Sequence, residues 1–391
     1  MIISLQLKNF YSIAEEVALD FTADMSARNK KDIKSENLLE FNGDQFIKII
    51  GLFGGNATGK SNIIKAVEFC RKLVVESHLY NEGIKYDFSP FKFDPDFPSE
   101  FAINFVTDGI EYEYLFSIYD NKILKEGLYY YPHKRKSKIF ERGDGRYSYG
   151  KGVLQRPAEI AANTGDHTLF LSRGSSMNRP VLQKVYRFFL DNILIGNYDV
   201  SFNGAAREDI EKYKPLLLTA LEVSDSDIVD MSMAEQTPGR YSLYTFHREN
   251  PSIAFDFERE ESEGTKRLFS LLVTLLKAIE TDTAIFFDEF DLKLHLRLAE
   301  FILDVIRASK KAQFIFTSHN SGLLNRDLLR DEQMVFVTKL PNGMSEFVAL
   351  SDYKDTGKIK DIQTAYLQGR FDGVPYTGNI KAALEANFSN R

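Results

Sequence analysis

The sequence predicts an α/β fold in which helices alternate with the strands of a buried parallel sheet. Three segments carry this prediction. Residues 46–53, 284–287 and 311–318 are short and largely apolar, and small or polar residues end or follow each of them. Strands that are buried on both faces of a parallel sheet have this composition. Segments 61–75 and 292–309 show helical spacing and follow the first two strands, as βαβ units require.

The first strand and its helix are joined by a glycine-rich segment. It reads Gly54-Gly55-Asn56-Ala57-Thr58-Gly59-Lys60-Ser61 and fits the phosphate-loop pattern G-x-x-x-x-G-K-[ST]. In such a loop the backbone N–H groups surround phosphate oxygens. Lys60 can reach the β- and γ-phosphates, and the Ser61 hydroxyl can ligate Mg²⁺. We expect nucleotide contacts from Gly54, Asn56, Gly59, Lys60 and Ser61, with the helix N-terminus facing the phosphates.

The other two strands end in residues suited to phosphate chemistry. Asp288 and Glu289 follow the second strand. Asp288 would hold the Mg²⁺ through water, and Glu289 would polarise the attacking water. An acidic pair that merely ends a core strand is the alternative. His319 follows the third strand and can contact the γ-phosphate and the water, although a surface histidine is the alternative there. Because ligands bind at the carboxyl ends of parallel strands, the functional interpretation is favoured for all three residues.

A second anion-binding helix terminus is predicted shortly before the Asp-Glu strand. Ser262 and Gly264 form an S-x-G motif at the start of a strongly apolar helix, residues 268–279. An ordinary N-cap is the alternative, and the local sequence alone would favour it. The position of the motif between the phosphate loop and the Asp-Glu strand favours a role in nucleotide binding.

The remaining elements divide the chain into three expected parts. We expect residues 1–79 and 251–391 to form the two halves of the core, and 80–250 to be an inserted β-rich and helical region. The expected strands are 5–10 and 17–21 in one hairpin, 101–106 and 112–118 in another, and 122–131; the expected helices are 180–193 and 208–221. A polar loop, 23–36, is expected over the nucleotide. No long heptad region is present, so a long coiled coil is not expected.

Composition and charge restrict the classes of partner. The net charge of −7 gives no global basic field for nucleic acid. A basic run, residues 133–138 beside three tyrosines, could contact a phosphate backbone, but a solvated strand end is the favoured interpretation. The single cysteine, Cys70, excludes an internal disulfide. The sequence shows no signal peptide and no apolar run of roughly 18 residues, so we expect a cytoplasmic protein without membrane contact.

The order of these motifs resembles that of ABC-type ATPases. Segments 5–10 and 54–62, the latter ending in Asn62, are similar to the SMC and RecF branch rather than to transporters. This resemblance implies ATP and Mg²⁺ as cofactors, with Asn62 among the nucleotide contacts. It also implies an ATP-dependent head-to-head dimer in which Ser262 touches the γ-phosphate bound by the partner copy. The sequence departs from the family in having Glu-Ser-Glu-Gly-Thr as its signature. It also has no glutamine assignable to the Q-loop, which is expected near residues 90–93.

A closer resemblance covers nearly the whole chain. The segments 261–267, 287–295, 317–319 and 366–371 with Val374-Pro375 are similar to compact bacterial AAA-15/AAA-21 ATPases, including RloA-like, AbiL-like and PARIS-type defence proteins. The resemblance implies a sensor or scaffold ATPase that answers a phage-encoded trigger. It would control a separately encoded effector, such as a Toprim or other nuclease. In the related overcoming-lysogenization-defect nucleases the Toprim domain is fused, but only about 70 residues follow His319 here, which is small for an added domain. A RecF-like DNA-repair ATPase that clamps DNA is the alternative.

Overall fold

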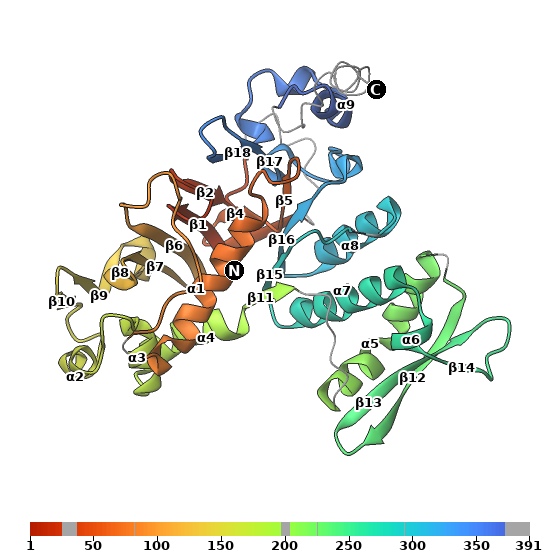
Figure 1. Cartoon of the computed structure of the whole chain (residues 1–391), viewed down its shortest axis with the longest axis horizontal. Coiled ribbons are helices and arrows are strands. Elements are labelled where there is room, and N and C mark those ends of the chain that lie inside the picture. Colours follow the sequence, from red (N-terminus) through yellow and green to blue (C-terminus); the bar gives the residue numbers. More distant parts are fainter. Residues whose placement is uncertain (26–36, 82, 197–203, 225, 293, 372–391) are drawn as a thin grey trace, which may run out of the picture.

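The computed structural model describes residues 1–25, 37–81, 83–196, 204–224, 226–292 and 294–371. The part of the chain so described forms two large sheets with a helix between them (Figure 1). One sheet is mostly parallel and carries the strand ends predicted to form the site. The other is antiparallel and begins with the N-terminal hairpin.

The mostly parallel sheet has six strands in the order β11-β15-β16-β5-β17-β18. Their bounds are β5 Ile49–Phe53, β11 Ile193–Gly196, β15 Ala284–Phe287, β16 Gln313–Ser318, β17 Met334–Lys339 and β18 Ser345–Ala349. The first five are parallel, and β18 returns antiparallel to β17. The predicted α/β class and parallel sheet are therefore confirmed, and the carboxyl ends of β5, β15 and β16 lie side by side.

The antiparallel sheet has seven strands in the order β10-β9-β8-β7-β6-β1-β2. Their bounds are β1 Ile2–Lys8, β2 Val17–Asp20, β6 Ser99–Thr107, β7 Ile110–Tyr119, β8 Lys122–Tyr130, β9 Ser137–Gly143 and β10 Arg146–Tyr149. The predicted hairpins are confirmed by the register, with Thr107 opposite Ile110 at the tight turn. Both turn residues, Asp108 and Gly109, have positive φ, as a two-residue hairpin turn requires.

Two smaller sheets complete the strand inventory of the described residues. β3 Leu38–Phe41 pairs with β4 Asp44–Ile47, and β12 Ile228–Thr237, β13 Arg240–His247 and β14 Ala254–Asp256 form a three-stranded sheet. Strands from the segment 80–250 are thus distributed over three sheets. β6–β10 extend the N-terminal hairpin, β11 joins the parallel sheet, and β12 and β13 lie apart with α5 (Figure 1).

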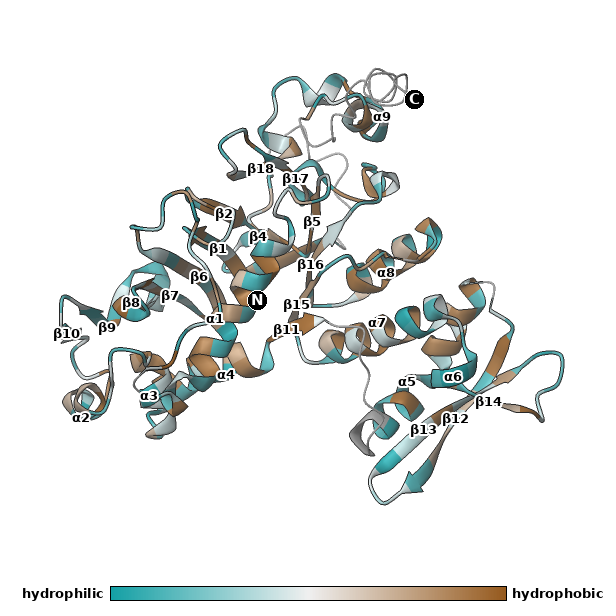
Figure 2. Ribbon diagram, in the orientation of Figure 1, coloured by the Kyte–Doolittle hydropathy of each residue, from teal (hydrophilic) through white to brown (hydrophobic). Residues whose placement is uncertain are grey.

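Helices cover both faces of the parallel sheet, with α1 on one face and α7 and α8 on the other. The helices of the described residues are α1 Ser61–Glu76, α2 Pro157–Ala162, α3 Phe170–Ser176, α4 Pro180–Asp191, α5 Gly204–Val223, α6 Phe257–Glu260, α7 Glu263–Glu280, α8 Leu296–Ala308 and α9 Ile362–Leu367. The side chains of β5, which point alternately to the two faces of the sheet, show which core each face joins. Ile50 and Leu52 join the core formed with α1 and the antiparallel sheet, whereas Ile49 and Phe53 join the core formed with α7 and α8. Figure 2 shows the hydrophobic colouring on β11 and β15, between these layers.

Several element bounds differ from the sequence predictions. The expected strand 46–53 is two strands, because the chain leaves the β3–β4 pair at Lys48. The ammonium group of this buried residue donates to the carbonyl oxygens of Arg307 and Ser309 at the end of α8. The expected helix 180–193 ends at Asp191, so that Ile193 begins β11. The expected loop 23–36 lies almost entirely outside the described residues, as do Val374 and Pro375.

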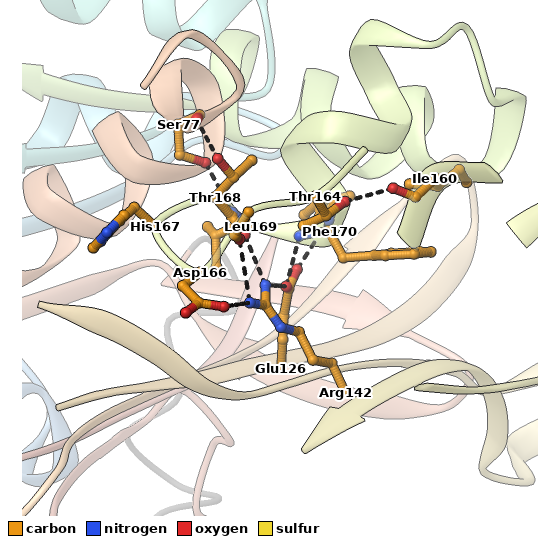
Figure 3. A network of polar contacts seen from close by, with 12 residues as sticks. Ser77, Glu126, Arg142, Ile160, Thr164, Asp166, His167, Thr168, Leu169 and Phe170 are labelled. Carbon is orange, nitrogen blue, oxygen red and sulfur yellow. Dashed lines mark hydrogen bonds and ion pairs between the residues drawn. The ribbon is translucent and has the colours of Figure 1, made fainter. Parts of the chain in front are cut away.

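A buried polar network joins the antiparallel sheet to the helical layer (Figure 3). The Glu126 carboxylate on β8 accepts hydrogen bonds from the N–H groups of Phe170 and Leu171 at the start of α3. Burial raises the pKa of Glu126, while the nearby Arg142 guanidinium opposes that shift. Arg142 also donates to the carbonyl oxygen of Thr168 at 2.8 Å. The network therefore satisfies a buried charge and a helix N-terminus together.

The C-terminal element packs on the parallel sheet. Phe371 stacks on Phe336 of β17, with ring centroids 4.7 Å apart, and meets the edge of Tyr353. Gly369 has a φ of +79° and ends α9, while the Arg370 N–H closes a hydrogen bond to Ala365. The Gly-Arg-Phe segment thus turns the chain out of α9 and places an aromatic ring over the sheet.

Candidate functional site

The phosphate loop runs from the end of β5 to the start of α1. A Cβ atom on Gly54 would collide with the carbonyl oxygen of Val337 on β17. A Cβ on Gly59 would collide with the hydroxyls of Ser12 and Ser345, and the φ of Gly59, +101°, already favours glycine. Both glycines are therefore required by packing on neighbouring strands as well as by the approach of a phosphate.

Lys60 lies in the centre of this loop. Its ammonium group donates to the carbonyl oxygens of Gly54 and Gly55 at 3.0 and 2.8 Å, and the residue is 5% exposed. Burial lowers the pKa of Lys60 to about 8, although Asp288 and Glu289 act in the opposite direction. The side chain stays mostly protonated at neutral pH and supplies a buried positive charge where phosphates would bind.

Asp288 and Ser61 meet directly at the start of α1. The Ser61 hydroxyl donates to Asp288 Oδ1 at 2.9 Å, and the Thr317 hydroxyl donates to the same oxygen at 2.5 Å. Mg²⁺ prefers such oxygen donors and takes one or two from protein, the rest from phosphates and water. The donor set therefore fits Mg²⁺. Among the described residues, no group of three or more His, Cys, Asp or Glu side chains gathers as an all-protein metal site.

Glu289 and His319 lie beside this pair. Glu289 Oε1 is 3.5 Å from His319 Nε2, and both side chains are partly exposed. The backbone of Glu289 is left-handed, with φ +49°, and its N–H donates to the Thr317 hydroxyl at 2.8 Å. Thr317 therefore fixes both acids of the Asp-Glu pair, a role that the sequence did not reveal.

Ser318, which follows Thr317 on β16, supports this arrangement through two hydrogen bonds. The Ser318 hydroxyl donates to Asp291 Oδ2 at 2.7 Å and accepts the N–H of Asn320. Burial raises the pKa of Asp291, and the hydrogen bond from Ser318 acts against that shift. The hydrogen bond between Ser318 and Asp291 thus connects the end of β16 to the turn after Glu289.

A cavity of about 680 Å³ opens over these groups. Its lining includes the predicted residues Asn56, Gly59, Lys60, Ser61, Asn62, Glu289 and His319. It also includes residues that were not predicted from the sequence: Tyr11, Ser12, Lys65, Lys339 and Gly343. Segment 90–93, where the Q-loop is expected, lines the cavity but contains no glutamine. Tyr11, Phe91 and Phe93 thus give the cavity an aromatic lining beside the phosphate loop.

Ser262 and Gly264 do not line this cavity. Ser262 is the N-cap of α7, and its hydroxyl accepts the Thr265 N–H at 3.1 Å, so the local N-cap interpretation is realised. Figure 1 shows α7 beginning beside α6, at the end remote from β15. Ser262 therefore lies outside the cavity of its own copy, and its role toward a partner copy stays a prediction.

His247 bridges two carboxylates, one of which belongs to Glu261, the residue before the Ser262 N-cap. His247 contacts Asp227 through Nδ1 at 2.7 Å and Glu261 through Nε2 at 3.0 Å. Burial lowers the pKa of His247, but the two carboxylates more than offset this effect and raise it above its ordinary value. The imidazole must be protonated to donate to both acids, so a charged histidine fixes the residue before Ser262.

Three lysines of the basic run pair with acids of nearby strands. Lys134, Lys136 and Lys138 form ion pairs with Asp44, Glu113 and Glu141 at 3.4, 2.7 and 2.6 Å. Lys136 also lies over the Tyr129 ring. These contacts favour the interpretation of the run as a solvated strand end.

The fold and the site define a class of protein, an α/β phosphate-loop protein whose strand ends converge on one nucleotide-sized cavity. The chain belongs to the family described as "AAA domain, putative AbiEii toxin, Type IV TA system", which matches residues 49–325 and thus well over half of the chain. No curated protein matches the sequence. Among the described residues, no helix has both the length and the apolar character needed to cross a membrane.

Solved structures of SMC heads are similar to the chain at low identity. An SMC head bound to the C-terminal winged-helix domain of ScpA has 16% identity and a TM-score of 0.45, and the match covers 92% of this chain and 99% of that one. The SMC head domain from Thermotoga maritima has 16% identity and a TM-score of 0.41, with 89% and 98% covered. An SMC head from Pyrococcus furiosus, with an extended coiled coil and bound to the C-terminal domain of ScpA, has 15% identity and a TM-score of 0.42, with 90% and 96% covered.

Proposed function

We propose that this protein binds ATP with Mg²⁺ and hydrolyses it slowly, as a switch. One observation carries the proposal: Lys60, Ser61, Glu289 and His319 line one cavity, and Asp288 accepts a hydrogen bond from Ser61 beside it. These residues follow three strands that are distant in sequence. Membership in the AAA-domain family supports ATP as the nucleotide. The aromatic part of the cavity, at Tyr11 and Phe91, would receive the base.

Each side chain has a role that follows from its position. Lys60 neutralises phosphate charge at a buried point, where its effect is least screened. Ser61 and Asp288 would hold Mg²⁺, which when bound neutralises charge that develops on the phosphates. Glu289 accepts a proton from the attacking water, or orients that water, and His319 lies close enough to share the same water.

Two copies would complete the site. Ser262 lies at the exposed N-terminus of α7, outside the cavity of its own copy, and a helix N-terminus attracts phosphate. ATP bound by one copy would then contact Ser262 and Gly264 of another. We propose this head-to-head dimer, or a higher assembly, as the ATP-bound state.

The biological setting that we propose is antiphage defence. The family description, with its toxin and type IV toxin–antitoxin system, supports this setting. In it, the ATPase senses a phage-encoded trigger and holds or activates a separate effector, such as a Toprim or other nuclease. The RecF-like alternative, an ATPase that clamps DNA, depends on the basic run, three of whose lysines are paired with acids of nearby strands.

One experiment tests both levels of the proposal. Wild type, Lys60→Ala and Glu289→Gln are compared for ATP binding and turnover, and Glu289→Gln is then purified with ATP from its native locus for mass spectrometry. We expect Lys60→Ala to lose binding and Glu289→Gln to bind without turnover. Normal turnover by Glu289→Gln would refute the catalytic assignment. A stoichiometric nuclease or toxin-like partner would support defence, whereas chromosomal DNA with repair proteins would support the RecF-like alternative.

A further inference from the structure

Polar groups beneath the phosphate loop form a chain of hydrogen bonds with a fixed direction. The Ser345 hydroxyl donates to the carbonyl oxygen of Thr58 at 2.5 Å, and it lies 2.6 Å from the Ser12 hydroxyl. Asn62 Nδ2 donates to Ser12 at 2.6 Å. Each hydroxyl has one proton, so Ser345, which gives its proton to Thr58, must accept from Ser12. The chain therefore runs from Asn62 through Ser12 and Ser345 to Thr58.

Both ends of this chain lie on the nucleotide-binding segment itself. Thr58 and Asn62 flank Gly59, Lys60 and Ser61, so the hydrogen bonds close a ring around the residues placed at the phosphates and the metal. The ring leaves no room for a side chain at position 59. A further hydrogen bond, from the Ser345 N–H to the Ser12 carbonyl oxygen at 2.8 Å, holds the two supporting segments to each other.

The hairpin of β17 and β18 contacts the other end of the loop as well. The Gly54 Cα packs on the carbonyl oxygen of Val337 on β17, as Gly59 packs on Ser345 of β18. Lys339, the last residue of β17, and Gly343, in the connection to β18, line the cavity. One hairpin, about 285 residues downstream in sequence, thus supports the first and the last glycine of the loop.

We infer that Ser345 and Ser12 are positioning residues that hold the phosphate loop in its nucleotide-binding conformation before the nucleotide arrives. The inference rests on the proposed ATP binding and extends it. Glycine-rich backbone has many accessible conformations, and ordering it at the moment of binding would reduce affinity. The ring orders residues 59–61 when the protein folds. Ser345 and Ser12 act through the loop backbone and do not themselves perform chemistry.

The test compares Ser345→Ala and Ser12→Ala with a matched control, Thr168→Val. Thr168 also donates a buried hydroxyl to a distant main-chain carbonyl, that of Ser77 at 3.1 Å, but does so in the network of Figure 3, away from the cavity lining. Each serine variant loses two hydrogen bonds of the chain, so we expect it to bind ATP at least about tenfold more weakly. Turnover at saturating ATP should stay within about twofold of wild type, because loop order is restored once ATP is bound. Thr168→Val should bind as wild type does.

Hydrogen exchange without nucleotide separates this inference from the proposed function. The Asn62 and Ile63 amides, bonded to the carbonyls of Gly59 and Lys60, should exchange faster in Ser345→Ala and unchanged in Thr168→Val. Wild-type affinity and wild-type protection in Ser345→Ala would overturn the inference, as would equal weakening in Thr168→Val. If wild type bound no ATP while the exchange difference appeared, the ATPase proposal would fail and the support of the loop would stand.

Discussion

Replacing Thr317 by valine tests whether the Asp-Glu pair depends on a single hydroxyl. Valine keeps the shape and the buried packing at the end of β16 but removes the hydrogen bond to Asp288 and the acceptor for the Glu289 N–H. A hydrogen bond to a charged group contributes about 1.5–3 kcal/mol, and an unsatisfied N–H costs about 1–3 kcal/mol. The two terms share one site and do not add fully, so we expect the free energy of unfolding to fall by about 2–4 kcal/mol.

The same change should slow ATP turnover. Asp288 and Glu289 lose their common anchor, and about 1.4–2.8 kcal/mol of lost transition-state stabilisation corresponds to a 10- to 100-fold lower kcat/KM. Urea unfolding and steady-state phosphate release measure the two effects. The control is Thr338→Val on β17, because the buried Thr338 hydroxyl makes no hydrogen bond among the described residues. Its loss should leave turnover near wild type and should not lower the free energy of unfolding. Wild-type stability and turnover in Thr317→Val would refute the reasoning.

Three further predictions concern regions outside the cavity. Ser262→Arg should spare ATP binding by single copies but abolish the hydrolysis that requires two paired copies. ATP titration measures the binding, and turnover as a function of protein concentration measures the paired hydrolysis; normal turnover would exclude the dimer model. Phe371→Ala should lower the free energy of unfolding by about 3–5 kcal/mol, because it removes a ring stacked on Phe336, whereas the exposed Leu367→Ala should change it by less than about 0.5 kcal/mol. The last variant is His247→Gln. Folding raises the pKa of His247, so the histidine contributes its full stabilisation below pH 6.5 and loses it as the pH rises through the pKa of the folded state. The stability difference between wild type and His247→Gln in urea unfolding should therefore shrink above pH 6.5, and a difference independent of pH would contradict the charged bridge.

The predictions that held depend on patterns within a few residues. The order of β5, the glycine-rich segment and α1, the two antiparallel hairpins and the apolar strands β15 and β16 each have a local signature of period or turn residue. The prediction of a single strand over residues 46–53 was wrong in one respect, because it too used only neighbouring residues. Lys48 is the one charged residue in this apolar run. The structure ends one strand there, where the Lys48 ammonium donates to carbonyl oxygens at the end of α8, about 260 residues away.

By itself, the sequence determined the α/β class, the phosphate loop and the acids and histidine at the strand ends, because backbone conformation and apolar periodicity are encoded by neighbouring residues. Tertiary structure decided which distant groups support them: Thr317 between Asp288 and Glu289, and Ser12 with Ser345 beneath Gly59. Serine and threonine are common and have no periodic signature, so their hydrogen bonds across hundreds of residues become apparent when the strands pair. The placement of Ser262 outside the cavity follows from the same physics, because the direction of α7 is set by its packing against the sheet and α5.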